Sequence, residues 1–188
     1  MKLLLATRND HKVREFERLL PGVEIDPLPP ELPTPEETGD TYAENALIKA
    51  RAAAAATGRH AIADDSGIEA EALQWRPGVR TARFAGDDAT DQENLDKLHR
   101  EAPPGSRARY VCVIAHVTPD GEETLFEGTC QGSLAERPAG DGGFGYDPLF
   151  IPEETPDRTM AELTDDEKDA ISHRGRAARE LLAWLGTT

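Results

Sequence analysis

The densest group of potentially reactive side chains follows a short apolar run. Residues 60–63 have the pattern of a buried strand, and Asp64 and Asp65 come directly after it. The end of a strand is where α/β enzymes commonly hold catalytic groups, and Gly67 permits a sharp backbone turn there. Two carboxylates in that place favour metal binding. The competing interpretation is that the two aspartates only cap a turn.

Further carboxylates lie upstream of this pair. Glu36 and Glu37 belong to an acidic, proline-rich stretch over 27–40, and Glu44 stands in the first turn of the helix predicted after it. Carboxylate oxygens are the ligands that Mg²⁺ prefers. A structural interpretation stays open, because Thr41 and Glu44 have the spacing of a capping box and the other two glutamates fit a solvated loop.

The loop after the first predicted strand suggests phosphate binding. Residues 7–12, Thr-Arg-Asn-Asp-His-Lys, combine a hydroxyl, an amide and cations at a strand-to-helix junction, where backbone N–H groups are available. The loop lacks the glycines of a P-loop. The alternative is a polar turn in which Asn9 or Asp10 caps the following helix.

Several cations and donors could act together with these groups. Lys49 follows Asn45 by four residues, so both lie on one face of a helix. Lys168, His173 and Arg174 occur near the last helix, and an arginine can grip a phosphate or a carbonyl with its planar fork. The alternative is that these are ordinary surface side chains.

A glycine-rich loop over 140–147 carries aromatic side chains. Phe144 and Tyr146 stand among its glycines, so a planar ring could approach the backbone closely and stack on an aromatic face. Asp147 precedes a proline, which steers its backbone towards an extended conformation. The competing interpretation is a tight loop with aromatic anchors.

Alternating strands and helices must position these motifs. Apolar patterning predicts strands over 2–6, 60–63, 68–73, 107–118, 124–136 and 148–151, the fourth and fifth forming a hairpin. Helices are predicted at 13–20, after the capping boxes that start at Thr41, Thr90 and Thr164, and towards the C-terminus, with a break at 172–174. We find no repeat or linker and predict one α/β domain over 1–188.

Composition narrows the classes of partner. The chain has 36 acidic and 21 basic residues, a net charge of −15, which repels nucleic-acid backbones. An anionic ligand would therefore require a local gathering of cations, or a metal. Cys112 and Cys130 are expected to be buried free thiols. The short apolar run at 3–5 predicts neither a signal peptide nor a membrane span, so we expect a cytoplasmic protein with no membrane or nucleic-acid partner.

Taken together, these motifs resemble the inosine triphosphate pyrophosphatase family, also called dITP/XTP pyrophosphatases, over nearly the whole chain. Six blocks occur in family order: Thr7-x-Asn9-x-x-Lys12, Glu36-Glu37-Thr38-Gly39, Glu44-Asn45-Ala46-x-x-Lys49-Ala50, Ala63-Asp64-Asp65-Ser66-Gly67, Gly142-Gly143-Phe144-Gly145-Tyr146-Asp147-Pro148 and Ser172-His173-Arg174. The chain departs from the family in carrying Arg8 and His11 where glycine is frequent, and Gln74-Trp75 in place of a glycine pair.

The resemblance implies a long mixed sheet flanked by helices, two lobes around a nucleotide cleft, and a homodimer. It also implies hydrolysis of ITP, dITP and XTP to the monophosphate and pyrophosphate, which removes these nucleotides from the pool. Asp65 would be the general base and, with Glu36, a ligand of Mg²⁺. The substrate-binding residues would be Thr7, Arg8, Asn9, Asp10, His11, Lys12, Lys49, Ser66, Phe144, Gly145, Tyr146, Asp147, Lys168, His173 and Arg174.

Three other functions stay open at this point. An aspartyl-phosphate phosphatase would use Asp65 as nucleophile and release orthophosphate, but the chain lacks the Asp-x-Asp pattern. A nucleotide-binding sensor would bind without hydrolysis, which the intact Asp65, Lys12 and Lys168 disfavour. A related pyrophosphatase could prefer a modified pyrimidine or another purine.

Overall fold

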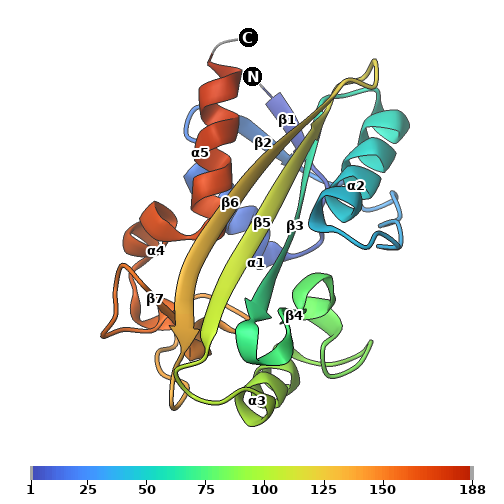
Figure 1. Ribbon diagram of the computed structural model, residues 1–188. Coiled ribbons are helices and arrows are strands. Elements are labelled where there is room, and N and C mark those ends of the chain that lie inside the picture. Colours follow the sequence, from blue (N-terminus) through green and yellow to red (C-terminus); the bar gives the residue numbers. More distant parts are fainter. Residues whose placement is uncertain (1, 187–188) are drawn as a thin grey trace. The chain divides into compact units, whose positions relative to one another are not determined.

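The computed structural model describes residues 2–186 and divides into two compact units. The first unit comprises the chain up to Asp65, then Cys112–Gly128 and the residues from Arg176 on, and the second comprises Ser66–Val111 and Thr129–Gly175. The strand order is β2-β1-β3-β5-β6-β7, with β4 paired to β3 (Figure 1). Strands β3, β5 and β6 each contribute residues to both units.

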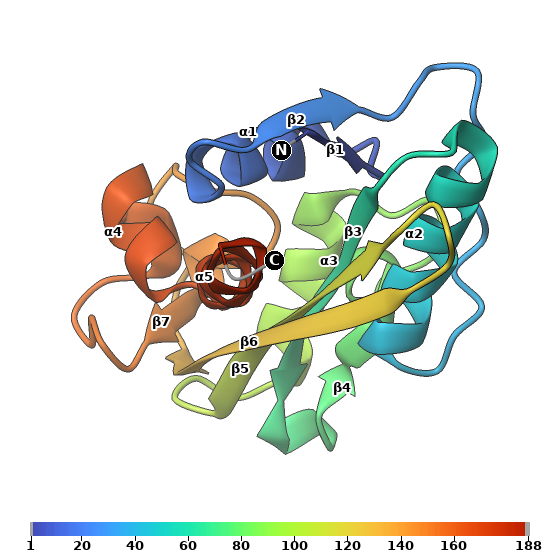
Figure 2. The same cartoon turned by 90° about the horizontal axis from the view of Figure 1, so that it is seen from above.

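In the first unit, parallel strands hold the two helices that carry candidate site residues. β1 (Lys2–Leu5) pairs in parallel with β2 (Glu24–Pro27) and with the start of β3 (Ala61–Ala70). The helix α1 (Asp10–Leu19) lies beside β2 (Figure 2). Because β1 is buried on both faces, its side chains are almost all apolar.

Two apolar cores stabilise this unit. One joins Leu3 and Leu5 of β1 to Phe16 of α1 and to Ala177 and Leu181 of the last helix. The other is built from small residues, because α2 (Tyr42–Thr57) presents a face of alanines to β1 and β3. Alanine is the best helix former and allows close packing, which accounts for this otherwise weakly amphipathic helix.

The second unit is built from the remaining strand segments and short helices. β4 (Arg76–Pro77) pairs antiparallel with the end of β3, and β7 (Phe150–Pro152) pairs antiparallel with the end of β6 (Glu123–Leu134). The other elements with residues in this unit are β5 (Arg107–Val117), α3 (Asp91–Glu101), α4 (Asp165–Ile171) and the start of α5 (His173–Leu185), which belongs to the first unit from Arg176 on. The unit also contains 3-10 turns at Glu71–Leu73, Gly78–Arg83, Asp147–Leu149 and Met160–Glu162.

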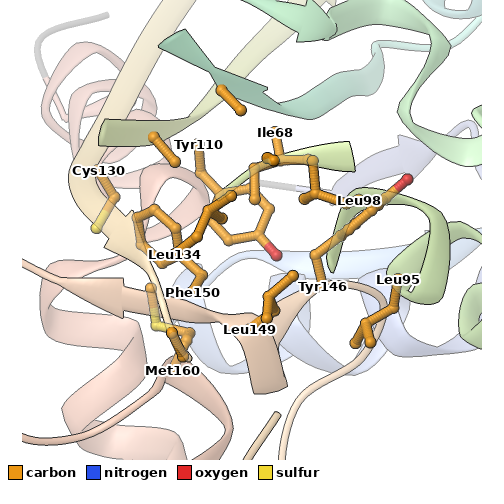
Figure 3. Close-up of a cluster of buried hydrophobic side chains, with 14 of the residues drawn as sticks. Ile68, Leu95, Leu98, Tyr110, Cys130, Leu134, Tyr146, Leu149, Phe150 and Met160 are labelled. Atoms are coloured by element: carbon orange, nitrogen blue, oxygen red, sulfur yellow. The ribbon is translucent and has the colours of Figure 1, made fainter. Parts of the chain in front are cut away.

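A single apolar cluster forms the core of the second unit. Tyr110 packs edge-on against Phe150 at a centroid separation of 4.7 Å, and Leu98, Leu134 and Tyr146 lie around them (Figure 3). Tyr146 of the glycine-rich loop therefore contributes to the packing of this core.

Most predicted elements are confirmed. The capping boxes at Thr41, Thr90 and Thr164 are all present, and Ser172 is extended and separates α4 from α5. Parallel and antiparallel pairs coexist, as predicted for a mixed sheet. Both cysteines are free and buried. Within residues 2–186, no helix has the length and apolar character needed to cross a membrane. The single domain predicted over 1–188 stays a prediction.

The prediction of a strand end at 63 is wrong. β3 continues from Ala61 to Ala70, so Asp64 and Asp65 lie within the strand and Gly67 does not turn the chain. Nearly every residue of β3 is buried, and this burial outweighs the low strand propensity of aspartate and glycine. Residues 71–73, the end of the strand predicted at 68–73, form a 3-10 turn. Residues 147–149 also form a 3-10 turn, so the strand predicted at 148–151 begins only at Phe150, as β7.

Candidate active site

In the first unit, carboxylates and lysines from three elements meet in what we call the acid–lysine cluster. Its members are Lys12, Glu37, Asn45, Lys49, Asp64 and Asp65. Lys12 Nζ lies 3.0 Å from both carboxylate oxygens of Asp64, whose side chain is fully buried. Lys49 donates a short hydrogen bond to Glu37. The cluster thus contains two ammonium groups and three carboxylates.

The helix α2 aims two of these side chains at the strand that carries the aspartates. Asn45 and Lys49 are one turn apart on its buried face, as their spacing predicted. Asn45 Nδ2 donates to Asp65 Oδ2 at 3.0 Å, and its Oδ1 accepts from the backbone N–H of Gly39 at 2.8 Å. Asn45 therefore orients the Asp65 carboxylate and fastens the start of the helix. Sequence reasoning placed Asn45 on this face but assigned it no role.

The charges of the cluster shift the pKa values of two members. Burial raises the pKa of Asp65, while the nearby ammonium of Lys49 opposes that shift. Burial alone would lower the pKa of Lys49, but Asp64, Glu37 and Asp65 outweigh it and raise the value. A carboxylate with a raised pKa is a better proton acceptor, and a lysine with a raised pKa stays charged. Asp65 could therefore accept a proton while Lys49 attracts a negatively charged ligand.

The donor set of the cluster is compatible with a substrate-assisted Mg²⁺ site. No group of three or more His, Cys, Asp or Glu side chains in residues 2–186 is arranged to hold a metal ion. Mg²⁺ is nevertheless usually held in nucleotide enzymes by one or two carboxylates together with substrate phosphates. Asp65 and Glu37 are carboxylates close enough to influence one another. Glu36, the predicted ligand, is exposed beside Glu37.

The first loop delivers Lys12 to the cluster and leaves its other polar groups near solvent. Asn9 is the N-cap of α1 and accepts from the N–H groups of His11 and Lys12, as in the structural alternative. Thr7 Oγ1 accepts from the Asn9 N–H at 3.2 Å. Asp10 and His11 are exposed. The Arg8 guanidinium turns to backbone carbonyls of the segment after β2.

The second unit contains another concentration of predicted residues, which we call the aromatic–cation cluster. Its members are Ser66, Tyr110, Phe144, Asp147, Lys168, His173 and Arg174. Asp147 accepts from Lys168 Nζ at 2.7 Å, from Tyr110 Oη at 3.1 Å and from the Phe144 N–H at 3.0 Å. Lys168 Nζ also lies 5.0 Å from the centre of the Phe144 ring.

Three further contacts complete this cluster. Arg174, which is 1% exposed, donates to Ser66 Oγ at 2.9 Å, and its guanidinium carbon lies 5.7 Å from the Phe144 ring. The His173 ring stacks on the Tyr110 ring at 4.5 Å and 7°. The cluster therefore offers cations, hydroxyls and an aromatic face, which together suit a planar polar ligand.

Some predicted residues have a structural role, and one participant was missed. The Tyr146 hydroxyl donates to the Thr81 carbonyl at 2.7 Å, so its buried ring anchors the loop, and Gly145 has a positive φ of 62° that favours glycine. Sequence reasoning missed Tyr110, because one tyrosine in an alternating strand carries no signal that distinguishes it from a core residue. Burial raises its hydroxyl pKa well above the ordinary value, and neighbouring Asp147 adds to the shift, so the hydroxyl stays a donor.

Comparisons with known proteins agree over nearly the full chain. The model of the Ham1 family matches residues 3–184. A dITP/XTP pyrophosphatase of Symbiobacterium thermophilum is 52% identical over 188 residues, covering 98% of this chain and 94% of the relative, and one from Corynebacterium efficiens is 47% identical, covering 97% and 96%.

Solved structures show the same fold. A HAM1 protein from Coxiella burnetii has a TM-score of 0.88 at 40% identity, covering all of both chains. The Staphylococcus aureus Ham1 protein has a TM-score of 0.86 at 39% identity, covering 100% of this chain and 99% of that one. Sequence and structure therefore agree that this chain belongs to the Ham1 family.

Proposed function

We propose that this protein hydrolyses the deaminated purine nucleotides ITP, dITP and XTP to the monophosphate and pyrophosphate. The observation that carries the proposal is the acid–lysine cluster, in which a buried aspartate of raised pKa lies beside two paired lysines. The proposal is supported by relatives of about half-identical sequence that are named dITP/XTP pyrophosphatases. Removal of these nucleotides from the pool would be the cellular consequence.

In the proposed reaction, Asp65 accepts a proton from the attacking water. The water oxygen forms a bond to the α-phosphorus while the bond from that phosphorus to the bridging oxygen breaks, and pyrophosphate leaves with the electron pair. Lys12 and Lys49 offset the negative charge of the phosphates, and the 7–12 loop contributes its hydroxyl and amide groups. Mg²⁺ held by Asp65 with Glu36 or Glu37 would supply further charge neutralisation at the phosphates.

The aromatic–cation cluster is proposed to bind the nucleoside. Hypoxanthine and xanthine carry an acceptor oxygen at position 6, whereas adenine carries an amino donor there. Arg174 and His173 are proposed to donate to that oxygen, so adenine would leave buried donors unpaired, which allows discrimination on the order of 10⁴. Phe144 provides a face for the base, and Lys168, Ser66 and the 145–147 backbone are proposed to hold the sugar and nearby phosphate.

A substrate panel tests the proposal. The protein is incubated with ITP, XTP, GTP, ATP and dTTP, with Mg²⁺ and with chelator, and pyrophosphate and orthophosphate are measured separately. We expect pyrophosphate from ITP and XTP, lost with chelator. Orthophosphate would indicate a phosphatase instead, and tight nucleotide binding without product would indicate a sensor. GTP is the sharpest comparison, because guanine shares the position-6 oxygen and must be excluded at position 2.

A variant pair separates catalysis from folding. Asp65→Asn keeps the size of the side chain and one acceptor oxygen for Asn45, but it removes the proposed base, so turnover should be lost while ITP binding is retained. Asn94→Ala is the matched control, because Asn94 is buried and bonds Ala82 and Ala85 in the second unit, so it should retain turnover. Full activity in Asp65→Asn would exclude the proposed role.

The resemblance also supports a homodimer in the cytoplasm, which we propose as the working form of the protein. Light scattering on the purified chain tests the oligomeric state. A mass near 41 kDa, twice the 20.5 kDa of one chain, is expected.

A further inference from the structure

The segment between β2 and α2 has little backbone pairing of its own to hold it. Four of its residues are prolines, at 29, 30, 33 and 35, and Pro27 ends β2 directly before it. Proline has no N–H group, so such a segment cannot form a regular ladder and its carbonyl groups need outside donors. This segment also carries Glu36 and Glu37, the two candidate metal ligands upstream of α2.

Packing beneath this segment is incomplete. A cavity of about 100 Å³ lies between the segment and α2. Leu28, Leu32 and Pro33 line it on the side of the segment, and Ala53 and Ala56 line it on the side of α2. The alanines of α2 are too short to fill this space. Apolar contact therefore fastens the segment less firmly than a well-filled core would.

Arg8 supplies the donors that the segment requires. Its Nη1 donates to the Leu28 carbonyl, and its Nη2 donates to the carbonyls of Pro29 and Leu32, all at 2.6 Å. Hydrogen bonds from a charged donor are stronger than those from a neutral one, and the planar guanidinium can serve several acceptors at once. One side chain from the first loop therefore spans five residues of the segment.

The far end of the segment is held by the acid–lysine cluster itself. Glu37 accepts from Lys49, and Gly39 donates its N–H to Asn45, which also holds Asp65. The segment is thus tied at 28–32 by Arg8 and at 37–39 by the cluster. Its conformation sets where the carboxylates of Glu36 and Glu37 lie relative to Asp65.

We propose that Arg8 is a positioning residue that holds the 28–37 segment and thereby presents its glutamates to a divalent cation at Asp65. The proposal rests on the proposed function for the identity of the cation. It replaces the sequence-based expectation that Arg8 contacts the substrate phosphates, since its guanidinium already serves three carbonyls.

Two variants of Arg8 and one matched control test the proposal. Arg8→Ala removes all three bonds. Arg8→Lys keeps the charge, but a single ammonium lacks the planar fork that reaches three acceptors. Arg51→Ala is the control, because Arg51 is also an exposed arginine of the first unit, paired with Glu123 far from the segment in sequence. All three are compared with the full wild-type chain.

The first readout is hydrogen exchange, measured by NMR without nucleotide, of the Leu32 and Gly39 N–H groups, which donate to Pro29 and to Asn45. Arg8→Ala should speed exchange there about tenfold, which corresponds to about 1.4 kcal/mol, and Arg8→Lys should resemble it. The second readout is Mn²⁺ binding to the protein alone, followed by electron paramagnetic resonance. Affinity should fall several-fold in both variants, and Arg51→Ala should match the wild type in both measurements.

Each contrary outcome has a definite meaning. Unchanged exchange in Arg8→Ala would overturn the tether. Faster exchange with unchanged Mn²⁺ affinity would overturn the positioning role. Wild-type behaviour of Arg8→Lys, together with an Arg8→Ala defect confined to the KM for ITP, would restore a phosphate contact. Neither readout requires turnover, so failure of ITP hydrolysis in the wild type would count against the proposed function and leave this test intact.

Discussion

Replacing Lys168 by methionine should destabilise the protein by about 3–5 kcal/mol, because it leaves a buried carboxylate without its cation. Lys168 Nζ and Asp147 Oδ2 are 2.7 Å apart, and both side chains are 4% exposed. The other donors described for Asp147, the Tyr110 hydroxyl and the Phe144 N–H, are neutral. Since a domain is stable by about 5–15 kcal/mol, the loss would be a large fraction of the total.

Urea unfolding at pH 7, followed by circular dichroism, measures this loss. The matched control is Arg158→Met, which breaks the Arg158–Glu167 pair of the same unit, whose side chains are 43% and 42% exposed. Because solvent screens this pair, its loss should lower stability far less. Adding Asp147→Asn to Lys168→Met should recover part of the loss, because it removes the orphan charge. A Lys168→Met variant no less stable than the control would refute the reasoning.

Three further outcomes are expected. His116 is buried, its Nδ1 has no hydrogen-bond partner among residues 2–186, and burial, then nearby His60, lowers its pKa to about 4. In the unfolded chain this histidine takes up a proton near pH 6.5, whereas in the folded protein it stays neutral down to about pH 4. The free energy of unfolding should therefore fall by up to about 3 kcal/mol as the pH drops from 6.5 to 4. Urea titrations at several pH values should show a shallower fall in His116→Leu. Gln74 has a positive φ of 57°, so Gln74→Gly should stabilise by about 0.5–1 kcal/mol, and a lower melting temperature would contradict this. Gly132→Ala would press a Cβ against the Ile151 carbonyl oxygen and place it 2.6 Å from the Phe150 ring, so it should cost about 1–3 kcal/mol in urea unfolding. The neighbouring substitution Ser133→Ala is the control and should cost less.

Features set by short stretches of chain were predictable from the sequence. The capping boxes at Thr41, Thr90 and Thr164 depend on residues three apart, and Gly58, left-handed at the end of α2, depends on its own backbone freedom. The spacing of Asn45 and Lys49 likewise reported a shared helix face. These signals are local, so no knowledge of the tertiary fold was required.

Features that depend on distant partners were not predictable. β3 continues through Asp64 and Asp65 because its surroundings bury them, although an apolar run followed by two aspartates and a glycine has the local pattern of a strand end. The same limit applies to the backbone contacts of the Arg8 side chain. Its acceptors lie at 28–32, in a segment with no periodic pattern to indicate where it runs.

Each lysine of the candidate site is held by a carboxylate. In a chain of net charge −15, Lys12 is positioned by Asp64, Lys49 by Glu37 and Lys168 by Asp147. Each lysine is thereby ordered before any ligand arrives, so a phosphate meets a cation whose conformational entropy is already reduced. These carboxylates therefore preorganise the lysines that the proposed nucleotide substrate would require.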